Sequence, residues 1–186
     1  MRFPFTRKPS PSVNDYIKQA TAALGVMDMA GYAAALSGYN QARLALKTVP
    51  TTSPRYASLT QRVDELGLRI AITGKVRSDT YLNSASEKKE QVDRSTAGKL
   101  LEGKGKKQIE GHVISDSHSR GIDRDVRGGL AYVKSAINVA SNLGGNQGIM
   151  NELHRRLSAF EAIKASTEDS NRYQPKNVRR LRFAPA

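Results

Sequence analysis

Three stretches in the first 76 residues place apolar side chains at the spacing of one helix face. The apolar positions of residues 13–27, 32–49 and 56–70 advance in alternating steps of three and four, which brings side chains to one side of an α-helix. Pro50 and Pro54 separate the second stretch from the third, with Ser53 as a helix N-cap. We therefore expect a compact antiparallel three-helix bundle over residues 12–76, with Arg55–Ile72 as its third helix.

Beyond residue 76 the helical pattern is weaker and is interrupted by glycine. Residues 77–114 are rich in charge and leave few core positions, so we expect a charged helical or flexible linker there. Residues 115–166 show a second apolar stripe, interrupted at Gly128-Gly129 and Gly144-Gly145, which is typical of an amphipathic, coiled-coil-like helix. No strand pattern is found, and the predicted fold class is all-α.

Composition limits what the chain can do. Hydrophobic residues make up 38% and aromatics 6%, enough for a helical bundle but little for a large core. There is no Cys, which excludes disulfides, zinc–thiolate sites, cysteine nucleophiles and cysteine lipidation. No stretch approaches the roughly 18 to 20 apolar residues of a membrane-spanning helix, so we expect a cytoplasmic protein that reaches membranes only peripherally.

The net charge of +13 indicates a polyanionic neighbour such as nucleic acid, an anionic membrane surface or an acidic protein. A solvated basic surface without a partner is the alternative. Residues 1–11 and 167–186 are expected to be disordered basic segments. The candidate polyanion contacts are Lys104, Lys106, Lys107, Arg172, Lys176, Arg179, Arg180 and Arg182.

Residue groups that resemble catalytic or metal sites are incomplete. Gly98–Lys104 has the spacing of a phosphate-binding loop, but Gly105 stands where Ser or Thr would hold magnesium, and no strand precedes it. His112, Asp116, His118 and Asp123 match no familiar metal-ligand spacing. His154 has no neighbouring acid that would make it a general base. We expect no enzyme, no cofactor and no metal.

The run Asp28–Ala42, with Gly31, Tyr32, Ala35, Tyr39 and Ala42, resembles the signature of microtubule-interacting-and-trafficking (MIT) domains. The resemblance covers residues 12–76, with a turn one residue shorter than usual. It implies a three-helix bundle that docks short peptides in grooves beside its third helix. An ordinary helical hairpin or a tetratricopeptide-like pair shares the same pattern. The residues assigned to this docking bundle are Tyr32, Ala35, Tyr39, Ala42, Leu59, Val63 and Leu66.

A second resemblance covers residues 115–165 and is to SNARE motifs, whose heptads are interrupted by one central Gln or Arg. With Gln147 as that residue, the apolar positions around it advance mostly in steps of three and four. The resemblance implies a seam that assembles with partner helices, while a generic amphipathic helix is the alternative. The seam comprises Ile122, Val126, Val133, Ala136, Ala140, Leu143, Gln147, Met150 and Leu157.

These patterns lead to two functional hypotheses. The first is a non-enzymatic trafficking adaptor or SNARE-like protein that forms hetero- or homo-oligomers with other helical proteins. The second is a basic helical structural protein of a nucleic-acid-containing assembly, either a virion, where it would lie inside the particle, or a ribonucleoprotein. In both, the basic segments contact an anionic membrane surface or nucleic acid.

Overall fold

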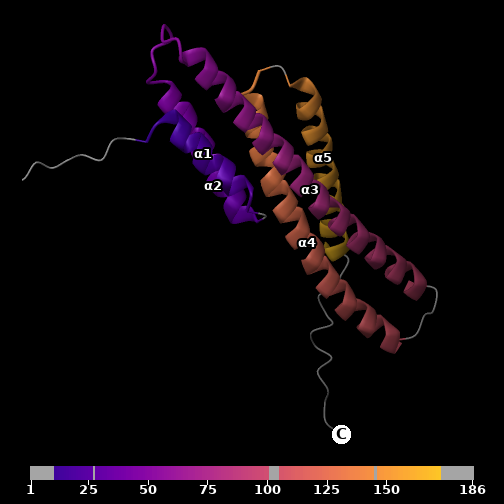
Figure 1. Ribbon diagram of the computed structural model, residues 1–186. Helices are drawn as coiled ribbons and strands as arrows, with labels where there is room; N and C mark the ends of the chain where they lie inside the picture. Colours follow the sequence, from indigo (N-terminus) through magenta and orange to yellow (C-terminus); the bar gives the residue numbers. More distant parts are fainter. Residues whose placement is uncertain (1–10, 27, 101–104, 145, 173–186) are drawn as a thin grey trace, which may run out of the picture. The chain divides into compact units, whose positions relative to one another are not determined.

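The fold is all-α, as the sequence predicts. A computed structural model describes the backbone of residues 11–26, 28–100, 105–144 and 146–172, and their side chains outside 94–119 and 168–172 (Figure 1). Within these ranges there is no strand. The helices are α1 (Val13–Leu24), α2 (Met29–Leu46), α3 (Tyr56–Leu100), α4 (Gly105–Ser141) and α5 (Gln147–Arg172).

The first two helices begin at capping residues. Ser12 caps α1 and forms a capping box with Asp15, whose carboxylate accepts the Ser12 backbone N–H at 2.9 Å. Asp28 caps α2 by accepting the N–H of Gly31 at 2.7 Å. The two helices lie side by side (Figure 1).

The third helix is much longer than the predicted Arg55–Ile72. It continues to Leu100, so the first part of the predicted 77–114 linker is a regular helix, and residues 105–114 belong to α4. Gly74 does not end α3 because it is a close-packing position: a Cβ there would lie 2.3 Å from the Tyr32 hydroxyl and 2.8 Å from the Ala136 Cβ. Residues 105–107 of the predicted linker begin α4, while Gly103 and Lys104 lie outside the described residues.

The two glycine pairs of the second half behave differently. The predicted interruption at Gly128-Gly129 is wrong, since α4 runs through it. A Cβ at Gly128 would lie 2.7 Å from Tyr81, and one at Gly129 would lie 2.0 Å from Phe160, so both glycines admit aromatic rings. The interruption near Gly144 is observed: this residue has a φ of 41°, and the chain leaves helical structure between α4 and α5.

The described residues form two compact units, one within Met1–Val76 and Lys134–Leu153, the other within Arg77–Val133 and His154–Ala186. In the first, α1, α2 and the start of α3 contribute buried residues such as Ile17, Tyr39 and Leu66. Ala136, Ala140 and Leu153 join this unit around Ala71, so 12–76 is not a bundle on its own. The core of the second unit contains Ala85, Ile122, Val126, Tyr132, Val133 and Phe160.

Candidate functional site

The residues assigned to the docking bundle form the core of the first unit. All except Leu59, which is half-buried, are at most 3% exposed. The Tyr32 hydroxyl donates to the carbonyl of Ile70 in α3 at 3.3 Å, and a Cβ at Gly38 would lie 2.8 Å from the Ala20 Cβ. Small residues thus permit close helix contact, while tyrosines fill the adjoining space. These side chains build the unit and are not accessible to a partner.

An open groove of about 580 Å³ lies on the surface of this unit, along the first turns of α3. One wall is formed by α3 residues between Tyr56 and Leu68, and the other by Leu143 and Asn146 from the end of α4 and the loop after it. Leu143 reaches α3 because position 67 is glycine, where a Cβ would lie 2.9 Å from the leucine Cδ2. The groove is therefore beside the third helix.

The groove combines an apolar floor with negative charge. Ala57, Leu68 and Leu143 supply apolar surface, and Asp64 and Glu65 are exposed carboxylates. Among the described residues, none that line it is positively charged, in a chain with a net charge of +13. A cationic partner would find in this groove an acidic site on an otherwise basic protein.

The negative charge of the groove contributes to the raised pKa of buried Tyr39. Burial of the phenol raises the pKa of Tyr39 above 10.0, the Arg43 cation opposes the rise, and the Asp64 carboxylate adds to it. The Tyr39 ring lies under Gly67, where a Cβ would be 2.9 Å from its Cε2. The Tyr39 ring therefore packs against the same part of α3 that carries the groove residues Asp64 and Leu68.

The outer face of α3 continues the groove as an apolar ridge. Leu68, Ile72 and Val76 follow one another at intervals of four residues, which align on a helix surface. Ile72 is 44% exposed and Val76 57%, among the largest exposures of a big apolar side chain in the described residues. The surface from Ala57 to Val76 extends about 29 Å at 1.5 Å per residue. We call it the α3 docking surface.

The predicted partner-helix seam lies mostly inside the protein. Ile122, Val126, Val133, Ala136 and Ala140 are at most 3% exposed, while Leu143, Met150 and Leu157 are half-buried. Gln147 is exposed, and its Nε2 donates to Asn151 Oδ1 of the same helix at 3.1 Å, so it forms no buried polar layer. Assembly through this seam stays a prediction, and it would require these residues to leave the chain's own core.

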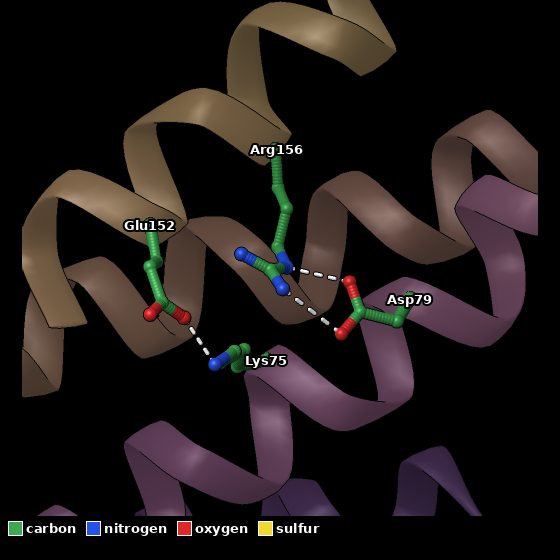
Figure 2. A network of polar contacts seen from close by, with 4 residues as sticks. All are labelled: Lys75, Asp79, Glu152 and Arg156. Atoms are coloured by element: carbon green, nitrogen blue, oxygen red, sulfur yellow. Dashed lines mark hydrogen bonds and ion pairs between the residues drawn. The ribbon is translucent and has the colours of Figure 1, made fainter.

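Ion pairs that the sequence did not reveal connect α3 to α5 (Figure 2). In the first unit, Lys75 pairs with Glu152. In the second, Arg156 binds Asp79 through Nε to Oδ1 at 2.5 Å and Nη2 to Oδ2 at 3.0 Å. Pairs with this geometry fix helix register. We assign them a structural role.

The predicted polyanion contacts can be placed only in part. Lys106, Lys107 and Arg172 lie in the terminal turns of α4 and α5, with undescribed side chains, while Lys104, Lys176, Arg179, Arg180 and Arg182 lie outside the described residues. In the described part of the chain, no group of His, Asp or Glu is arranged to hold a metal, and no helix is long and apolar enough to cross a membrane.

Comparison with known proteins gives no relative. No protein-family model matches the chain, and neither a curated protein nor a solved structure matches it.

Proposed function

We propose that the protein is a non-enzymatic, helical protein–protein interaction module that docks a basic helical segment of a partner protein along α3. The observation that carries the proposal is the acidic groove beside α3, whose apolar floor continues into the exposed side chains of Ile72 and Val76. The likeness of Asp28–Ala42 to MIT domains supports this role, because those domains dock peptides beside their third helix. It also favours a trafficking adaptor as the cellular context.

The shape of the surface favours a helical occupant. Leu68, Ile72 and Val76 form a ridge of residues four apart, which is the kind of ridge that enters the groove between side-chain rows of a second helix. No sheet edge exists among the described residues, so strand addition has no template there. A partner helix of about 18 residues, or five turns, would cover the surface.

Apolar contact supplies most of the expected affinity. Complete burial of a Leu, Ile or Val side chain contributes about 1.5 to 3 kcal/mol, and these three side chains are only partly exposed before binding. The carboxylates of Asp64 and Glu65 are solvent-exposed, and exposed ion pairs contribute about 0.2 to 1 kcal/mol each. Their main effect is therefore to select a cationic partner and to orient it.

A labelled synthetic peptide tests the proposal. The probe is an amphipathic helix of about 18 residues built from Leu, Ala and Lys, and the control peptide carries Glu in place of each Lys. Fluorescence anisotropy with the full chain at moderate salt should detect the Lys peptide. Asp64→Lys with Glu65→Lys should weaken its binding about tenfold, since two attractions become repulsions.

A charge-matched control variant distinguishes an effect of the groove carboxylates from an effect of the protein's net charge. Glu87→Lys with Glu161→Lys makes the same change in net charge at two exposed positions outside the groove, and it should leave peptide binding within about twofold. Equal weakening by both double variants, or equal binding of the Lys and Glu peptides, would exclude the acidic groove as the docking site.

A further inference from the structure

A row of three arginines occupies the outward face of α4 in the second unit. Arg120, Arg124 and Arg127 are all exposed, and their spacing of four and three residues places them on one side of the helix. The row extends about 10 Å at 1.5 Å per residue. It was not among the polyanion contacts predicted from the sequence.

The fold separates charges that look balanced in the sequence. The segment Asp123–Arg127 contains two acidic and two basic residues, but Asp125 is only 8% exposed. Its Oδ2 accepts hydrogen bonds from Lys88 Nζ at 2.5 Å and Ser84 Oγ at 2.7 Å, both from α3. Lys88 therefore neutralises the negative charge of Asp125 inside the unit, and this charge does not offset the exposed arginines of α4.

Of the two acids on the part of α4 whose side chains the structure describes, one, Asp123, remains close to the row. Asp123 accepts a hydrogen bond from Arg127 one turn along α4, and this exposed pair is only weakly bound. Exposed charge on the other described faces of this unit is mixed. It comprises Glu87, Glu90 and Asp93 on α3, and Arg155, Glu161 and Lys164 on α5.

The side chains on and around the arginine row indicate which class of ligand it would bind. The arginine guanidinium is a planar fork that binds phosphate through two parallel hydrogen bonds. Among the described outward positions of α4, none is aromatic, so stacking on single-stranded bases is not offered. The large apolar residues Ile122, Val126 and Val133 are buried in the chain's own core and cannot enter a lipid surface.

We propose that Arg120, Arg124 and Arg127 form a binding site for the phosphate backbone of a double-stranded nucleic acid. A straight helix with arginines along one face contacts backbone phosphates without reading bases, so binding is independent of sequence. The site is distinct from the α3 docking surface, and the two proposals stand or fall separately. The arginine row would locate, within the described structure, the nucleic-acid binding that the net charge indicates.

The experiment measures salt dependence with the full chain. Anisotropy of a labelled duplex of about 24 base pairs, as DNA and as RNA, is recorded across salt concentrations for the wild type and for the triple variant Arg120→Gln, Arg124→Gln, Arg127→Gln. Each lost phosphate contact lowers the slope of log affinity against log salt by about 0.9. We expect the triple variant to lose about 2 to 3 from the slope and at least tenfold in affinity at low salt.

The control removes the same charge elsewhere. Arg55→Gln, Arg69→Gln and Arg155→Gln are all at exposed positions, and this variant should keep the wild-type slope to within about 1. Circular dichroism establishes that both variants are folded. Equal losses in the two triple variants, or no duplex binding by the wild type, would overturn the proposal.

Vesicles of phosphatidylcholine with phosphatidylserine distinguish a lipid surface from a nucleic acid. The proposal predicts that substitution of the arginine row reduces duplex binding more than vesicle binding. If the variant loses vesicle binding and keeps duplex binding, the row is a membrane contact and the nucleic-acid assignment is wrong.

Discussion

Arg156 of α5 and Asp79 of α3 form a two-point ion pair, with Nε to Oδ1 at 2.5 Å and Nη2 to Oδ2 at 3.0 Å. The side chains are 19% and 39% exposed respectively, so water screens the pair only in part. Lys cannot reproduce the fork of hydrogen bonds that Arg makes. The pair therefore joins two helices at a fixed register.

The first prediction concerns this pair. Arg156→Lys should lower the free energy of unfolding by about 1 to 2 kcal/mol, because a charged hydrogen bond is lost and the carboxylate is left partly unsatisfied. Urea denaturation measures the effect. Arg155→Lys, at the exposed neighbouring position, should change stability by no more than about 0.5 kcal/mol. Similar values for the two variants would show that the pair contributes nothing specific.

The second prediction concerns the N-terminus of α1. Hydrogen bonds from the Ser12 backbone and hydroxyl lower the pKa of Asp15 below 3.8, with a smaller contribution from Lys18. Because the folded pKa is the lower one, the stabilisation is complete above about pH 4 and is lost as the pH falls through the folded pKa. Asp15→Ala should therefore lower the melting temperature more at pH 7 than near pH 2. An equal effect at both pH values would contradict this.

The third prediction compares two glycines of α4. A Cβ at Gly129 would lie 2.0 Å from fully buried Phe160, whereas one at Gly121 would lie 3.5 Å from the flexible Lys88 side chain. Alanine gains about 1 kcal/mol of helix propensity over glycine at either site. Overpacking at Gly129 costs about 1 to 3 kcal/mol. Thermal melting should show Gly121→Ala stabilised and Gly129→Ala destabilised, and the same sign for both would refute the packing explanation.

The fourth prediction distinguishes a core from a partner seam. Leu143 is half-buried against α3 at Gly67, so Leu143→Asp should lower the melting temperature of the isolated chain markedly, because it places a charge against apolar side chains. Gln147→Leu, at an exposed position, should leave it nearly unchanged. An unaltered melting temperature for Leu143→Asp would indicate that the seam is a partner interface rather than part of the chain's own core.

The sequence predicted the helical class and many buried positions, because a stripe such as Tyr32, Ala35, Tyr39 can lie only on one helix face. It did not predict the length of α3 or the continuity of α4. Gly74 and Gly129 look like helix breaks in sequence, but each admits an aromatic side chain from a distant segment. That information exists only after folding.

The functional surfaces were harder to find for a related reason. An apolar stripe such as Ile122, Val126, Val133 shows that a face is buried, but not whether the same chain or a partner covers it. Asp64 and Asp125 are both acids within helices, yet the first lines a groove and the second pairs with Lys88 inside the unit. Charge patterns in sequence do not show which side chains point outward.

The most direct test of docking along α3 is a methyl NMR titration of the full chain, labelled at Ile, Leu and Val, with the basic Leu/Ala/Lys peptide. If a partner helix docks along α3, the methyl signals of Leu68, Ile72 and Val76 on the α3 docking surface shift on binding, while those of buried Val126, Val133 and Leu153 do not. The opposite pattern, with shifts at Val126 and Val133 and none along α3, would show that partners bind by opening the core, and it would contradict the proposed docking surface.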